Sequence, residues 1–130
     1  MFTSEKEPII LTTTAWDNQQ TYTTRDARPI LNIYLKKLNL TSPHRLMPLK
    51  QANYLFAYLS QAYLNKKIPL GEYAALGHYF FHLLGKHHPH SALFDVSLIA
   101  SQLWFTSHQS SVDLSSDEQE IAFFVQQQDL

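Results

Sequence analysis

Apolar residues recur with the 3.6-residue period of an α-helix along most of the chain after residue 26, and no other feature constrains the fold as strongly. A helix that carries such a stripe must bury it against other helices, because water solvates a large apolar surface poorly. The spacing predicts five helices, near residues 29–38, 49–65, 70–84, 91–105 and 115–125. We therefore expect a mainly α fold, a compact bundle of about five helices.

Residues 8–24 follow a different pattern. Residues 9–16 are rich in β-branched side chains, Asp17 and Asn18 supply turn residues, and residues 20–24 are again strand-like. This order predicts a short N-terminal β-hairpin, which must pack on the helices or on a partner because a lone hairpin is only marginally stable. The 130 residues then form a single helical domain, with the hairpin at 8–24 and the helices in 26–130.

Three local motifs predict how the helices meet and end. Gly77 lies inside the apolar stripe of the third helix, which indicates that another helix approaches closely there. Gly85 followed by Pro89 is typical of a left-handed cap residue and a helix breaker. Ser115 with Glu118 three residues later is the pattern of a capping box. We expect five apolar side chains of the stripes to be buried: Leu55, Leu59, Phe80, Val96 and Ile99.

Composition narrows the class of protein. Apolar residues make up 45% of the chain and cysteine is absent, so a core can form without disulfides, and thiolate catalysis and cysteine-based metal sites are excluded. The three glycines are not clustered as a phosphate-binding loop requires. The N-terminus lacks the pattern of a signal peptide, and no apolar run approaches the length of about 18 residues that a membrane span needs. We expect a cytoplasmic protein without a membrane segment or cofactor.

Charge is sorted by position, although the formal net charge is only −1. Residues 25–67 contain eight basic residues against one acid, a net charge of +7. Residues 87–130 contain six acids and no Lys or Arg, a net charge of −6. This asymmetry indicates either a charged partner or two parts of the chain that attract each other in the fold.

Histidines are clustered in one part of the chain. Five of the seven lie between residues 78 and 90. His78 and His82 are four residues apart on a predicted helix, the spacing of helical zinc ligands, and His90 could supply a third ligand. However, a helical wheel turns this face towards water, and histidines near a helix C-terminus are favoured by the helix dipole alone. We expect no metal site, with these three residues as the weak candidates.

The predicted fourth helix carries a second apolar stripe, nearly opposite its main one. It consists of Phe94, Leu98 and Phe105. Such a strip, if exposed, would indicate a binding surface; the alternative is a helix sandwiched between two layers. No spacing in the chain forces a nucleophile, a base and an acid together, so we expect no enzymatic activity.

In residues 55–84, one predicted helix ends in the polar turn Asn65-Lys66-Lys67-Ile68, and the acidic–aromatic pair Glu72-Tyr73 opens the next. This arrangement resembles a helix pair of the small helical bacterial immunity proteins of the colicin D type. The resemblance implies a protein that neutralises a cognate toxin, commonly a tRNA-cleaving nuclease, by covering its active site with an acidic surface. It also implies that the chain has no catalytic residues of its own.

These observations favour a non-catalytic binding protein, an immunity protein or inhibitor whose partner is a basic toxin domain. The expected partner-binding residues are acidic and apolar side chains of the C-terminal part: Asp113, Asp117, Glu118, Glu120, Phe94, Leu98 and Phe105. The first alternative is a small helical regulator that binds nucleic acid through residues 25–67. The second is a metal-binding protein or enzyme built on the histidines.

Overall fold

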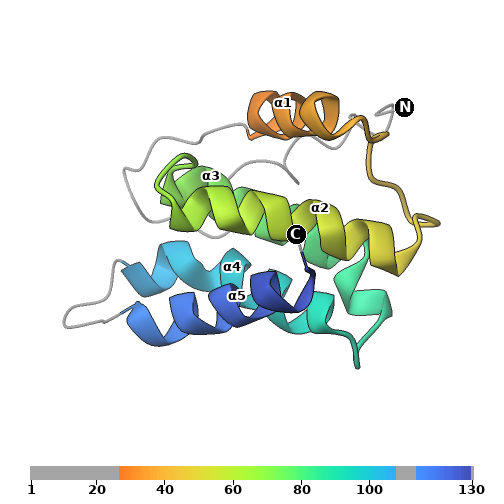
Figure 1. Cartoon of the computed structure of the whole chain (residues 1–130). Helices are drawn as coiled ribbons and strands as arrows, with labels where there is room; N and C mark the ends of the chain where they lie inside the picture. Colours follow the sequence, from red (N-terminus) through yellow and green to blue (C-terminus); the bar gives the residue numbers. More distant parts are fainter. Residues whose placement is uncertain (1–26, 108–113, 130) are drawn as a thin grey trace.

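The structure, a computed structural model, describes residues 27–107 and 114–129 (Figure 1). Its α-helices are α1 (Arg28–Leu38), α2 (Leu49–Leu64), α3 (Leu70–Leu83), α4 (Ala92–Ser107) and α5 (Ser115–Gln127), with a short 3-10 helix η4 (Gly85–His87) after α3. The expected helical class is confirmed, and no strand occurs in these two ranges. The hairpin predicted at residues 8–24 lies outside the described residues.

Four of the helices form a closed ring. In sequence order, α2 contacts α3, α3 packs along α4, α4 contacts α5, and α5 returns to α2. Helix α1 lies on the outside of this ring against α2, as Figure 1 shows at the top of the molecule. Pro29 lies in the first turn of α1, where proline favours the start of a helix, and Lys36 and Lys37 are exposed.

The core lies between the four helices, and aromatic side chains fill much of it. Phe56 of α2 is fully buried, with its ring centroid 4.9 Å from that of Phe80 and 5.6 Å from that of Tyr73, both on α3. On its other side it meets Phe124 of α5 at 6.3 Å. One side chain thus joins three helices, and the other predicted core residues Leu55, Leu59 and Val96 are buried as expected.

The closest approach of two helices is at Gly77. A Cβ atom at this position would stand 2.5 Å from the Cβ of Ala100 and 2.8 Å from the backbone nitrogen of Ser101, both on α4. Contacts this short do not occur between real side chains, so any residue larger than glycine would force α3 and α4 apart. The prediction of a close approach at Gly77 is confirmed.

Two predicted helix caps are wrong. No glycine in the described ranges has a positive φ, so Gly85 is not a left-handed cap; it opens η4 instead. Glycine is needed there for a different reason, because a Cβ would lie 2.8 Å from the hydroxyl of Ser97 on α4. The N-cap residue of α5 is Leu114, which makes no side-chain cap, and not Ser115 as the capping box predicts. The carboxylate of Glu118 is engaged elsewhere, as described below.

Ile99 was predicted to be a buried core residue, and this prediction is wrong. Its side chain is only partly buried, whereas Val96, one turn earlier on α4, is buried. The reason is tertiary: α5 leaves a hollow beside α4 at this level. None of the helices in residues 27–107 and 114–129 is long and apolar enough to cross a bilayer.

Candidate protein-binding site

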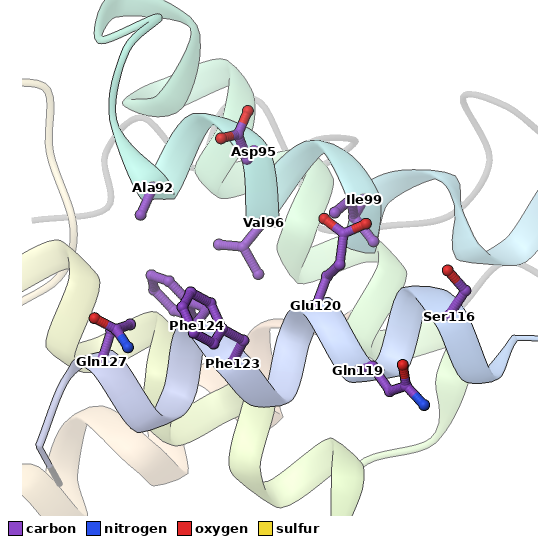
Figure 2. A pocket seen from close by; sticks show the side chains of 10 residues that line it. All are labelled: Ala92, Asp95, Val96, Ile99, Ser116, Gln119, Glu120, Phe123, Phe124 and Gln127. Carbon is purple, nitrogen blue, oxygen red and sulfur yellow. The ribbon is translucent and has the colours of Figure 1, made fainter.

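A groove of about 440 Å³ runs between α4 and α5 (Figure 2). Each wall is one face of a helix. The residues of α4 that line it follow the spacing i, i+3, i+4, i+7: Ala92, Asp95, Val96 and Ile99. Those of α5 continue the same spacing for one further turn: Ser116, Gln119, Glu120, Phe123, Phe124 and Gln127.

The groove combines an apolar floor with an acidic rim. Val96 and Phe124 are buried at its base, and Figure 2 shows Val96 pointing from α4 towards α5. Asp95 on one wall and Glu120 on the other are exposed. The lining contains no Lys or Arg, so the carboxylates give the groove a negative potential.

Phe123 is the most unusual side chain of this surface. It is 62% exposed, although it stands next to the buried Phe124. Exposing a phenyl ring to water is unfavourable by about 25 cal/mol for each Å². A large exposed aromatic side chain beside an apolar floor is typical of a residue that becomes buried in a complex.

Two other hollows have different chemistry. One of about 590 Å³ lies between the start of α2 and the end of α5, and its lining carries charges of both signs, on Lys50 and Asp129. The other, of about 660 Å³, lies between α1 and the segment after it, beside Lys36 and His44. Both are larger than the α4–α5 groove. Neither combines an apolar floor, an exposed phenyl ring and charge of one sign.

The predicted acidic residues divide between structural and exposed positions. Glu118 accepts a hydrogen bond of 2.6 Å from the hydroxyl of Tyr63, which ties α5 to α2. Burial, together with this hydrogen bond, raises the pKa of Tyr63 far above its usual value, so the hydroxyl stays protonated and donates. Asp117 is half-buried, Glu120 is exposed on the groove rim, and Asp113 lies outside the described residues. Of the three that the structure describes, Glu120 is the one that lines the groove.

The second apolar stripe of α4 is partly buried at the two of its residues whose side chains the structure describes. The ring of Phe94 packs on Phe81 of α3 with centroids 5.3 Å apart, and both Phe94 and Leu98 are partly buried. Phe105 belongs to α4, and its side chain is not among those described. Phe94 thus contributes to the contact between α3 and α4.

Sequence reasoning missed the exposed phenyl ring of the groove, Phe123, and one of its two carboxylates, Asp95. Phe123 lies about 150° round the helix from the buried stripe of α5, which consists of Ile121, Phe124 and Val125, so its ring points away from the core. That signal was available in the sequence. Asp95 carried no such signal, because its place on the rim depends on where α5 lies.

Comparisons of the chain with protein-family models, with curated proteins and with solved structures find no significant match. The case for a function therefore depends on the chemistry of the groove and on the resemblance of residues 55–84 described above.

The two central histidines form a pair on α3, with ring centroids 4.3 Å apart. His82 is exposed, but His78 is partly buried, so the prediction that this whole face points to water is wrong for His78. Burial, and to a smaller extent the nearby His82, lowers the pKa of His78 from 6.5 to about 4. His90 is exposed beyond η4. In the part of the chain that the structure describes, no three His, Asp or Glu residues are grouped closely enough to hold a metal ion.

We expect the burial of His78 to make stability depend on pH. Between its ordinary pKa of 6.5 and the folded value of about 4, the unfolded chain binds a proton at this imidazole that the folded chain does not bind. Proton binding therefore stabilises the unfolded state relative to the folded state as the pH falls, and the free energy of unfolding decreases on acidification. Wild type should lose more Tm between pH 7 and pH ~4.5 than His78→Gln, with an intermediate loss for His82→Gln. Equal losses in wild type and His78→Gln would contradict the burial of His78.

Proposed function

We propose that this protein is a non-catalytic inhibitor that binds a basic protein partner through the α4–α5 groove, in the manner of an immunity protein. The observation that carries the proposal is the groove itself. It offers an apolar floor, the exposed ring of Phe123 and the carboxylates of Asp95 and Glu120, without a basic side chain in its lining.

The chemistry of the groove suits a partner rich in Arg or Lys. An interface needs a central apolar anchor for affinity, and buried aromatic rings are common anchors. Carboxylates at the rim attract a basic protein during diffusion and mainly accelerate association. A toxin that acts on nucleic acid needs a basic active-site surface to bind phosphates, so a complementary acidic surface can block it.

The nucleic-acid alternative finds less support in the arrangement of the basic residues. Lys50 lies at the start of α2, whereas Lys66 and Lys67 follow its end. A helix of 16 residues spans about 24 Å, so these lysines lie at opposite ends of the bundle. Nucleic-acid-binding proteins usually gather their basic residues in one patch or stripe.

The proposal predicts protection against a toxin. The products of the genes next to the gene for this chain would be expressed one at a time in a test host, with and without this chain. We expect one product to arrest growth and this chain to restore it, with the two proteins forming a complex whose association slows at high salt. A toxic neighbour that is neither bound nor counteracted would contradict the proposal.

Matched variants identify the surface in the same assay. Asp95→Asn with Glu120→Gln should slow association, whereas Asp117→Asn with Asp129→Asn, which removes the same charge outside the groove lining, should have a smaller effect. Phe123→Ser should abolish protection. Ile33→Ser is its control, because Ile33 is 61% exposed on α1, away from the groove.

A further inference from the structure

We infer that the partner segment received by the α4–α5 groove is an amphipathic basic α-helix of about three turns. This inference rests on the proposed function, since it specifies which element of the basic partner enters the same groove. It depends on three properties of the groove: the spacing of its walls, its length, and the positions of its carboxylates.

The spacing of the walls is that of a helix-packing surface. Ala92, Asp95, Val96 and Ile99 on α4 follow i, i+3, i+4, i+7, and the lining residues of α5 follow the same rule. Ridges with this spacing on two neighbouring helices leave a groove into which the side chains of a third helix fit. Binding of an amphipathic helix in such a groove is a recurrent mode of recognition.

An extended segment would fit this groove less well. Its backbone N–H and C=O groups need partners when they are buried, and a sheet edge normally provides them. Both walls here are α-helices, whose backbone groups between the first and last turns are already bonded within each helix. An incoming helix brings its own backbone hydrogen bonds and needs only side-chain contacts.

The length of the walls sets the size of the segment. The lining of α5 runs from Ser116 to Gln127, which corresponds to about 17 Å or three helical turns. A helix of about 12 residues matches that length. The apolar side chains that touch Val96, Ile99 and Phe123 would recur every third or fourth residue along it.

The carboxylates define where the partner's charge belongs. Asp95 lies on the α4 rim and Glu120 on the α5 rim, and in Figure 2 the Glu120 side chain extends from α5 towards α4. A helix seated between them would therefore place Arg or Lys on both flanks of its apolar stripe. Glu on those flanks would be repelled from both rims.

The test uses four synthetic peptides of about 12 residues as probes. The first is a stapled helix with a leucine stripe flanked by arginines. The second has the same stripe flanked by glutamates. The third has the composition of the first with its leucines scattered around the helix, and the fourth is an unstapled, proline-containing version of the first. Binding to the full chain is measured by fluorescence anisotropy, and the site is mapped by NMR chemical-shift changes.

We expect the first peptide to bind, with shifts at Ile99, Glu120 and Phe123. Phe123→Ser should weaken it by about tenfold or more, whereas Ile33→Ser should leave its affinity unchanged. The other three peptides should each bind about tenfold or more weakly than the first. Circular dichroism of both variants establishes that the fold is retained.

Each other outcome identifies what has failed. If the peptide with scattered leucines or the proline-containing peptide binds as tightly as the first, the inference of a helical partner segment is overturned. The acidic groove would then remain a site for another kind of basic segment. Equal binding of the glutamate-flanked peptide would overturn the electrostatic basis of the proposed function itself. Absence of binding by the first peptide would overturn the helical partner, while growth protection tests the proposed function separately. Self-association in analytical ultracentrifugation that Phe123→Ser abolishes would assign the groove to a second copy of this chain and overturn the inference.

Discussion

Phe56→Ala is expected to lower the free energy of unfolding by about 3–5 kcal/mol, the largest effect of any single truncation that we propose. The Phe56 ring is fully buried and touches the rings of Tyr73, Phe80 and Phe124. Removing it leaves a cavity bordered by three helices, which cannot all move inward because α2 through α5 form a closed ring. The loss is measured by denaturant unfolding at constant temperature.

Phe123→Ala is the matched control for this prediction. The same atoms are removed from a helix of the same bundle, but the ring is 62% exposed. We expect the free energy of unfolding to change by no more than about 0.5 kcal/mol, the usual range for a surface substitution. Similar losses in the two variants would show that the core does not centre on Phe56.

The second large effect is expected at Gly77. Gly77→Val should destabilise the fold by about 3 kcal/mol, because the new side chain would overlap the Cβ of Ala100 and the backbone of α4. Overpacking against backbone is costly, since backbone cannot rotate away as a side chain can. Gly77→Ala should also destabilise the protein, by about 1–3 kcal/mol, although alanine is the better helix former by about 1 kcal/mol.

Gly85→Ala separates steric overlap from a general effect of replacing glycine. The nearest atom to its new Cβ would be the hydroxyl oxygen of Ser97, a side-chain atom that can move. Its cost in unfolding free energy should therefore be smaller than that of Gly77→Ala. A Gly77→Ala variant more stable than wild type would contradict the close approach of α3 and α4.

The substitution at Gly77 should also affect the candidate site, because α4 has two functions in the fold. One side of α4 packs against α3 near Gly77, and another forms a wall of the groove. Any shift of α4 away from α3 would change the spacing between Val96 and Phe124 at the groove floor. We therefore expect Gly77→Val to weaken partner binding as well, although residue 77 itself would not contact the partner.

The sequence by itself determined the helices, because helical periodicity is a local property of the chain. The stripes of α2, α3 and α4 predicted their ends within about two residues, and the position of Gly77 within its stripe predicted a close helix contact. Segregated charge likewise predicted an acidic C-terminal part. Each of these features can be read from residues a few positions apart, where backbone geometry alone sets which side chains share a face.

Only the tertiary structure decided which faces remain open. The sequence left open whether the stripe of Phe94 and Leu98 is exposed; the structure shows both side chains partly buried, with Phe94 against Phe81 of α3. Ile99 looked like core and instead lines the groove, while Glu118 bonds to Tyr63 across the bundle. Exposure of a helix face depends on where the neighbouring helices lie, and no local pattern predicts that residues as far apart in the sequence as Asp95 and Glu120 line one groove. The groove therefore emerges only when α4 and α5 are placed side by side.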